Sequence, residues 1–281
     1  RGIQVECDKA LGYRLTQPLV LLDCDRINTY LKSPATIELF DTIHSTSQYL
    51  FERIHTYDLP LCFCLAEEQT QGHGRQSRTW YSPYAKNIYL SAYFRLNYDP
   101  LSLGSMIHHI SLIIIETLST YLDRARLKIK WPNDILYDGQ KIAGTLIESV
   151  FESNGDCQLV IGIGINVNSD QQELASIDQP TSSILAITSQ YIDRNPLVAT
   201  LIDHIKNCYR YFDSHPSVSM PNAWLEYDCL IGQAITMNTA RQQISGTVVG
   251  YNEYGHLQLR DANGVINTFS CGYASIQKNN T

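Results

Sequence analysis

Apolar and polar residues alternate on both sides of Asp138-Gly139, within a segment (130–149) that reads KWPNDILYDGQKIAGTLIES. Alternation with a period of two is typical of strands that bury one face. An Asp-Gly pair supplies the positive φ angles that a two-residue hairpin turn requires. The pattern therefore predicts a β-hairpin at the middle of the chain.

The entrance of this predicted hairpin carries an unusual number of polar residues. Lys130, Asn133 and Asp134 stand around Pro132, and Lys141 follows just after the turn. Unpaired charges are costly to remove from water, so a hairpin that served only as scaffold would carry valine or threonine there. The segment therefore indicates a functional site.

Hydrophobic periodicity predicts a mixture of helices and strands up to about residue 230 and short strands after it. The predicted helices cover 22–31, a segment that begins at Ser45, 101–122, 181–190, 196–212 and 222–229. The predicted strands cover 5–15 as a short ribbon, 59–66, 87–95, 158–168, 234–237, 244–250, 256–259 and 265–269. Caps are expected at Thr181 and Asn195, a capping box at Ser45 and Gln48, and a second tight turn at Asn154-Gly155. The change of pattern near residues 230–233 predicts a second, small β-domain.

Composition narrows the class of protein. A chain of 281 residues has room for one large and one small domain, and 44% apolar with 17% charged residues is ordinary for a globular protein. The longest apolar run, at 110–115, is far shorter than the roughly 20 residues that span a bilayer, and no signal peptide opens the chain. We therefore expect a cytoplasmic protein without a membrane partner. The net charge of −7 disfavours a general binder of nucleic-acid backbones.

The eight cysteines contain no C-x-x-C pair. This spacing argues against a zinc site and for reduced thiols, and Cys62 and Cys64 are expected to be small buried residues on one face of a strand. His108 and His109 have no acidic or cysteine partners at helical spacing, so we expect no metal site there.

Two further stretches have the composition of a binding site. Residues 68–80 combine glycines with arginines and end at Trp80, and such loops commonly close over phosphates because backbone donors and guanidinium groups match phosphate oxygens. Gly162 and Gly164 share one face of a predicted strand, which suggests that another group approaches the backbone closely. Neither a G-x-G-x-x-G nor a G-x-x-x-x-G-K-[ST] loop is present, so ATP would need a different cradle.

Several of these motifs together resemble those of the biotin protein ligases. KWPND followed by K-x-x-G-x-L-x-E is similar to the central motif of that family, and the 72–80 loop resembles its G-R-G-R-x-G-R-x-W loop, with His73 and Ser77 in place of an arginine and a glycine. The stretch 41–48 takes the place of a D-S-T-N-type motif, with His44 and Gln48 as departures. The resemblance covers nearly the whole chain.

The resemblance implies an α+β fold, with a mixed sheet and helices of the class II aminoacyl-tRNA synthetase and biotin ligase type. It implies a remnant of the wing of a winged helix-turn-helix with its linker at 1–20, a catalytic domain at 21–230 and an SH3-like barrel at 231–281. Because the chain begins at Arg1 without a methionine, we expect that a DNA-binding segment precedes it in the full-length protein.

The function implied by the resemblance is ATP-dependent biotin protein ligation. Biotin is activated as biotinyl-5'-AMP with release of pyrophosphate, with Mg²⁺ on the phosphates, and is then transferred to a lysine of the biotin carboxyl carrier protein of acetyl-CoA carboxylase. No permanent cofactor is implied. The resemblance also implies a homodimer when the adenylate is bound, and operator DNA as a partner of a full-length chain only. A lipoate-attaching ligase and a ligand-sensing repressor remain as alternatives.

The resemblance also assigns roles to individual residues. The catalytic group comprises Lys141, which is expected to bond the carboxylate and the transferred phosphoryl group, with Arg75, Lys130 and Asp134. Asp134 either orients the incoming lysine amine or pairs with Lys130. The biotin pocket is assigned to Ser45, Thr46, Gln69, Gly72, His73, Arg75, Lys141, Gly144, Gly162 and Gly164. The adenylate or ATP site is assigned to Arg75, Gln76, Arg78, Trp80, Asn133, Lys141 and Asn166.

Overall fold

The computed structural model describes residues 5–8, 12–56, 60–97, 99–151, 156–239, 242–271 and 274–276. A seven-stranded mixed sheet forms the centre, in the order β3-β4-β5-β9-β8-β7-β6. Its strands are β3 (Ile37–Ile43), β4 (Leu61–Gln69), β5 (Ile88–Asn97), β6 (Leu127–Lys130), β7 (Asp134–Tyr137), β8 (Gln140–Phe151) and β9 (Asp156–Ile165). Only the β3-β4 pair in this described sheet is parallel. The predicted mixed sheet with helices is confirmed.

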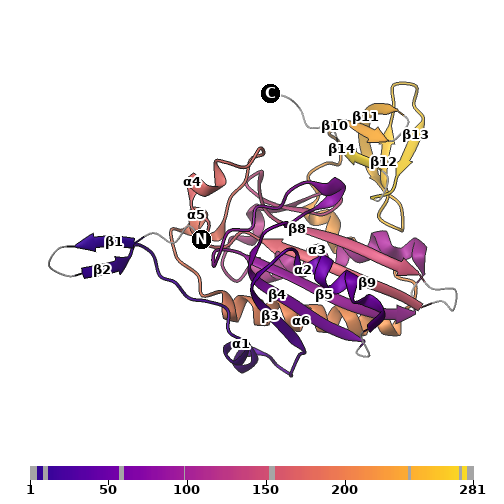
Figure 1. Ribbon diagram of the computed structural model, residues 1–281. Helices are drawn as coiled ribbons and strands as arrows, with labels where there is room; N and C mark the ends of the chain where they lie inside the picture. The colour runs from indigo at the N-terminus through magenta and orange to yellow at the C-terminus, as the bar shows by residue number, and fades with distance from the viewer. Residues whose placement is uncertain are drawn as a thin grey trace.

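Helices cover both faces of this sheet (Figure 1). Helices α3 (Leu103–Leu118) and α6 (Arg194–Ser214) pack on each other and against the sheet, and α2 (Thr46–Glu52) lies on β4, β5 and β9. The shorter helices are α1 (Cys24–Tyr30), α4 (Gln171–Leu174) and α5 (Ile184–Thr188). Beneath α2, a small apolar cluster includes Cys62 and Cys64, which are buried as predicted, and burial raises the pKa of the Cys62 thiol to about 12.

The predicted central hairpin is present as β7 and β8. Asp138 and Gly139 form its turn with φ angles of 48° and 79°, the positive values that the Asp-Gly pair predicted. Beyond the turn, β8 pairs along its length with β9. The hairpin is therefore joined to the middle of the sheet, and Asp134 at its polar entrance is opposite Gly144, which is itself opposite Gly164 of β9. The predicted turn at Asn154-Gly155 lies outside the described residues.

A second sheet follows the central domain. Its five strands lie in the order β13-β12-β11-β10-β14, and they are β10 (Ala234–Thr239), β11 (Gln243–Tyr251), β12 (Leu257–Arg260), β13 (Ile266–Phe269) and β14 (Ala274–Ile276). The indole Nε1 of Trp131 donates to the Gly255 carbonyl over 3.0 Å, so the second domain directly contacts the turn formed by residues 131–133, called the WPN turn below. At the other side of the molecule, β1 (Val5–Asp8) and β2 (Gly12–Leu15) form the predicted antiparallel ribbon, which projects from the body (Figure 1).

Several predicted helix limits are wrong. Helix α5 is capped by Ser183 and not by Thr181. Thr181 is extended and forms a parallel β-bridge with Lys141, so it cannot begin the helix. Helix α6 is capped by Asp193, because the side chain of Asn195 donates to the Leu21 carbonyl. The predicted 222–229 helix is a 3₁₀ helix, Asn222–Tyr227.

The predicted capping box and the long central helix also need correction. Ser45 does cap α2 by accepting from the Gln48 amide, but the Gln48 side chain donates to Glu52. Helix α3 ends at Leu118, short of residue 122, because the hydroxyls of Thr117 and Ser119 bond backbone carbonyls in the last turn. Among the described residues, no helix combines the length and the apolarity needed to cross a membrane.

A buried charge pair fixes the segment that enters the central domain. Arg194 is fully buried, and its guanidinium lies 2.7 Å from the Glu67 carboxylate while donating to the carbonyls of Val20 and Asn87. Glu67 in turn accepts from the amide of Leu22. The pair therefore ties residues 20–22 to β4, the strand that leads into the 72–80 loop.

His108 lies where α3 meets the second sheet, and it supplies a prediction about stability. It is fully buried, its Nδ1 lies 2.6 Å from the Gly104 carbonyl, and its ring contacts Trp224. Burial lowers the pKa of His108 to about 4, below the usual 6.5. Between these two pH values the unfolded chain binds a proton that the folded protein does not. The free energy of unfolding should therefore fall by up to about 3 kcal/mol from this group as the pH drops from about 6.5 to about 4.

Denaturant unfolding at several pH values checks this expectation. A His108→Phe variant keeps an aromatic ring at the position but cannot bind the proton, so its unfolding free energy should depend less steeply on pH over that range. An identical pH dependence in the two proteins would contradict the assignment.

Candidate active site

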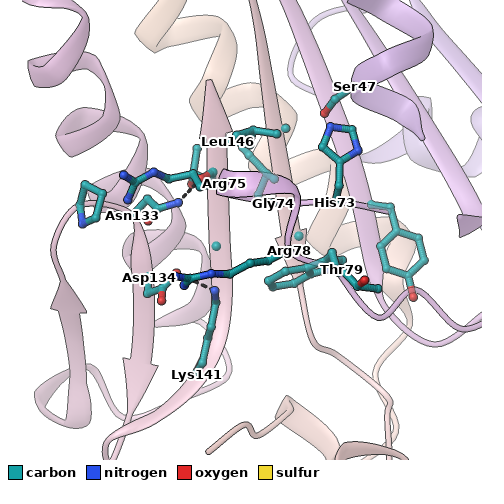
Figure 2. A pocket seen from close by; sticks show the side chains of 18 of the residues that line it. Ser47, His73, Gly74, Arg75, Arg78, Thr79, Asn133, Asp134, Lys141 and Leu146 are labelled. Carbon is teal, nitrogen blue, oxygen red and sulfur yellow. Dashed lines mark hydrogen bonds and ion pairs between the residues drawn. The ribbon is translucent and has the colours of Figure 1, made fainter. Parts of the chain in front are cut away.

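A pocket opens over β8 and β9 and contains most of the residues that the sequence singled out. It encloses about 1150 Å³, counting the part that is open to solvent, and it is lined by α2, the 72–80 loop, the WPN turn, β8, β9 and Ile276 of the second sheet. Figure 2 shows Ser47 and His73 toward one end and Asp134 and Lys141 toward the other. Elements from across the whole chain therefore meet at this pocket.

The floor of the pocket is made of glycines on two paired strands. Gly144 and Gly164 are opposite each other, and Gly162 lies two residues along β9. A Cβ atom on Gly162 would come within 2.3 Å of Ser47 Oγ, and one on Gly164 within 2.3 Å of the Trp80 ring. The predicted close approach to the strand is confirmed, and the approaching groups are a serine hydroxyl and an indole.

One end of the pocket holds a chain of hydroxyl and amide groups. Thr46 Oγ1 lies 2.8 Å from Ser91 Oγ, and Ser47 Oγ lies 2.9 Å from the same atom. The Gln69 side-chain oxygen accepts from the backbone amide of Thr46 over 2.9 Å, and its Nε2 donates to Ser82 over 3.1 Å. This end offers donors and acceptors in fixed positions, which suits a small polar ring.

The other end is charged. Lys141 Nζ lies 2.6 Å from an Asp134 carboxylate oxygen and 5.2 Å from the centre of the Trp80 ring. Asp134 therefore pairs with Lys141 and not with Lys130, the partner that the sequence suggested. Lys130 lines the pocket and forms no ion pair with any described residue. The Asn133 side chain donates to the Thr145 carbonyl and so fixes the WPN turn on β8.

The 72–80 loop is folded over the pocket as a narrow turn. Its ends are held by the Trp80 amide, which donates to the Gly72 carbonyl over 2.8 Å, and by the Gly74 amide, which donates to the Arg78 carbonyl over 2.8 Å. Ser77 has a φ of 54°, a value that glycine adopts at less cost. This explains why the resembling motif has glycine at that place, and it shows that serine tolerates the turn.

Arg75 reaches from this loop to the second sheet. Its guanidinium donates to the Cys271 carbonyl, and burial lowers its pKa. Arg78 donates to the Gln76 side chain over 3.1 Å. Both arginines line the pocket, and each has a neutral oxygen as a partner that a phosphate oxygen would outcompete.

Most predicted site residues are brought together here. The pocket is lined by Ser45, Thr46, Gln69, His73, Arg75, Arg78, Trp80, Lys130, Asn133, Asp134, Lys141, Gly144, Gly162 and Gly164. Within the described structure, three predicted residues do not line it. Gly72 packs against Ser82 and the Trp80 carbonyl, Gln76 points to Arg78, and Asn166 is buried with its amide donating to the Ser182 carbonyl.

Other lining residues were not predicted. Ser47 follows two predicted residues and faces Gly162, so the glycine pattern together with the helix start offered a signal for it. Gln179 and Ile276 come from distant segments, and no local motif marks them. Ser91 lies behind the pocket and holds Thr46 and Ser47, which only the strand register reveals.

The contact between Gly162 and Ser47 leads to a prediction about packing. A Gly162→Ala variant should lower the free energy of unfolding by about 1–3 kcal/mol, because the new methyl group overlaps Ser47 Oγ in a well-packed site. Chemical denaturation measures this loss. The double variant Gly162→Ala with Ser47→Ala removes the overlapping oxygen, leaving the nearest neighbours at 3.7 Å, and should regain most of the stability. Equal loss in the single and double variants would show that the contact is not the cause.

Comparisons with known proteins agree with this geometry. Residues 39–166 match the biotin/lipoate A/B protein ligase family and residues 230–276 match the biotin protein ligase C-terminal domain. The bifunctional ligase/repressor BirA of Salmonella typhimurium is 32% identical over 278 residues, which cover 98% of this chain and 85% of the relative. That of Escherichia coli is 29% identical, with 98% and 84% covered.

A solved structure shows the same fold. The biotin protein ligase from Aquifex aeolicus in complex with biotin and ATP superposes with a TM-score of 0.69 at 23% identity, covering 86% of this chain and 99% of that one. Fold and site thus define an enzyme of the protein ligase class. The chain belongs to the biotin protein ligase family, and the predicted biotin protein ligase activity is confirmed at that level.

Proposed function

We propose that this enzyme joins biotin to ATP as biotinyl-5'-AMP, with release of pyrophosphate, and then transfers the biotinyl group to a lysine of the carrier protein of acetyl-CoA carboxylase. The single observation that carries the proposal is the pocket with a hydroxyl-amide end and a cationic end, joined by a glycine floor. The Aquifex structure holds biotin and ATP, and a relative from Paracoccus denitrificans, 29% identical over 203 residues, is named for acetyl-CoA carboxylase.

In the first step, the biotin carboxylate attacks the α-phosphate of ATP and pyrophosphate leaves. The hydroxyls of Thr46 and Ser47 and the amide of Gln69 are suited to the ureido ring, and the flat glycine floor admits the ring system. Lys141, beside Gly144, then meets the carboxylate and the α-phosphate together. One positive charge between two anions reduces their repulsion and fixes the line of attack.

In the second step, the carrier lysine amine attacks the acyl carbon and AMP leaves. Asp134 stands 2.6 Å from Lys141 at the charged end, where it can receive a hydrogen bond from the incoming amine. Its pairing with Lys141 keeps this carboxylate in place before the amine arrives.

Mg²⁺ enters the proposal with the nucleotide. Within the described ranges, no group of three or more His, Cys, Asp or Glu side chains is placed to hold a metal ion. We expect Mg²⁺ to arrive on the ATP phosphates, since this ion is commonly held by substrate phosphates with few protein ligands. Mg²⁺ bound there would neutralise part of the phosphate charge. Arg75, Arg78 and Lys130 would supply the positive charge that comes from the protein.

Transfer to a purified carrier domain tests the proposal. With biotin and ATP, the mass of the carrier should rise by one biotinyl group, and a carrier whose target lysine is replaced by arginine should remain unmodified. Lipoate in place of biotin tests the lipoate alternative, against which the match to the biotin ligase C-terminal domain argues. Modification by lipoate alone would overturn the choice of substrate.

Repression is a second candidate function, favoured by the names of the two enterobacterial relatives and by the β1-β2 ribbon. We expect residues 1–281 to dimerise more with biotin and ATP and, with a net charge of −7, not to bind operator DNA tightly. Sedimentation and electrophoretic mobility measure these two properties separately. Tight, sequence-specific DNA binding by these residues, or a monomer at all ligand concentrations, would contradict the respective half.

We also propose an SH3-like fold for the second domain and a class II synthetase-like fold for the first. The five antiparallel strands β10 to β14 support an SH3-like barrel, and the mixed seven-stranded sheet supports a relationship to class II synthetases. The domain limits at residues 20 and 230 and a cytoplasmic location likewise remain predictions.

A further inference from the structure

Glu148 is a carboxylate of the central motif for which the proposed reaction has no use. Alternate residues of β8 share one face, so Glu148 continues the row formed by Gly144 and Leu146, both of which line the pocket. Its side chain is 32% exposed, but its Oε2 atom is buried and has no hydrogen-bond partner within the described structure. A buried carboxylate oxygen without a partner is costly, and a cation nearby would offset that cost.

The group opposite this oxygen is His73 of the 72–80 loop. His73 Nε2 lies 4.0 Å from Glu148 Oε2, and His73 Nδ1 lies 3.4 Å from the Gln71 carbonyl. A carbonyl beside Nδ1 favours the tautomer that carries its proton on Nδ1, so Nε2 is the nitrogen that gains a proton. Protonation therefore places a positive charge and a donor toward the Glu148 oxygen. The backbone of His73 also forms an antiparallel β-bridge with Thr79 across the loop. A contact that fixes His73 therefore fixes both sides of the turn.

Apart from Lys130 at the end of β6, which forms no ion pair with a described residue, the other charged side chains around the pocket have partners of their own. On the loop, on β7 and β8, and on α2, the engaged pairs are Arg75 with the Cys271 carbonyl, Arg78 with Gln76, Lys141 with Asp134, Glu52 with Gln48, and Arg53 with the Tyr49 ring. His73 and Glu148 are therefore the pair through which a change of protonation reaches the loop.

We propose that Glu148 is a positioning residue that holds the 72–80 loop closed through His73, and that the hold tightens when His73 is protonated. The proposal rests on the proposed function, in which Arg75 and Arg78 of this loop face the nucleotide phosphates. An arginine at position 73 would hold the loop at every pH, whereas histidine makes retention of the intermediate depend on pH. The loop should open more readily when His73 is neutral than when it is protonated, because only the protonated ring attracts the Glu148 carboxylate.

The release of labelled biotinyl-adenylate from the full chain measures this hold. For the unmodified protein, release should be about fivefold faster near pH 8 than near pH 6, the factor expected for one charge pair at about 4 Å in a water-like medium. Glu148→Gln and His73→Gln should each make release fast and insensitive to pH, and the double variant should be no faster than either. His73→Arg should make it slow at both pH values. Glu52→Gln and His215→Gln, on α2 and after α6, serve as matched controls that keep the pH ratio.

Hydrogen exchange of the loop amides without ligand tests the same contact independently of any reaction. After correction for intrinsic exchange, the amides of residues 72–80 should be less protected near pH 8 than near pH 6, and Glu148→Gln should abolish that difference. Unchanged pH ratios in Glu148→Gln and His73→Gln would overturn the proposal. If no adenylate forms, the proposed function fails. The exchange measurement still decides whether the contact between Glu148 and His73 holds the loop closed.

Discussion

Replacing Lys141 by alanine should slow formation of biotinyl-adenylate by a factor on the order of 10² to 10³, the usual cost of removing one group that stabilises charge in the transition state. The Lys141 side chain is only 16% exposed and carries the charge nearest to the glycine floor. Its loss also leaves the Asp134 carboxylate without its partner, facing two incoming anions. Pyrophosphate release measures the rate.

A control separates this effect from a general loss of positive charge. Lys128 lies on β6, and its amine bonds the Glu226 carbonyl outside the pocket, so Lys128→Ala should release pyrophosphate at close to the unmodified rate. The thermal midpoint of Lys141→Ala should stay near that of the unmodified protein, because the side chain lines a pocket that is open to solvent and is not part of the apolar core. Normal pyrophosphate release by Lys141→Ala would defeat the role given to this residue.

Replacing Arg194 by methionine should lower the free energy of unfolding by about 3–5 kcal/mol. Arg194 is 0% exposed, and without it the buried Glu67 carboxylate loses the guanidinium 2.7 Å away. Denaturant unfolding gives the size of the loss. Because Glu67 lies on β4 two residues before Gln69, the variant should also disturb the hydroxyl-amide end of the pocket.

The double variant Glu67→Leu with Arg194→Met provides the matched comparison. It removes both charges together, so it should recover a large part of the stability lost in Arg194→Met. If Arg194→Met cost less than about 1 kcal/mol, the buried pair would not be what fixes residues 20–22 to β4.

The central hairpin and the glycine floor could be predicted because their signals are local. Asp138-Gly139 can form only a few kinds of turn. Gly162 and Gly164 indicate that another group lies close to the strand, even though the sequence does not say which segment provides that group. Strand β3 was missed because its residues are only half buried at the edge of the sheet, so alternation is weak. Strand β6 was missed because Pro132 and the polar WPN turn obscured the short run before it.

Long-range contacts set the limit of the prediction at the site. The pairing of Asp134 with Lys141 depends on the register of β7 with β8, since Asp134 is opposite Gly144 there. The contact of Arg75 with Cys271 joins positions 196 apart in the chain. The predicted helix cap at Thr181 was wrong for the same reason, because Thr181 forms a β-bridge with Lys141 and so cannot begin a helix. Such competition between local preference and tertiary contact does not appear in a local pattern.

Mass spectrometry of the purified chain tests the central claim most directly. After incubation with ATP, Mg²⁺ and equal amounts of biotin and lipoate, the protein should carry a non-covalent ligand with the mass of biotinyl-5'-AMP, and Lys141→Ala should carry little or none. A lipoyl-adenylate, or no adenylate on the unmodified protein, would contradict the account.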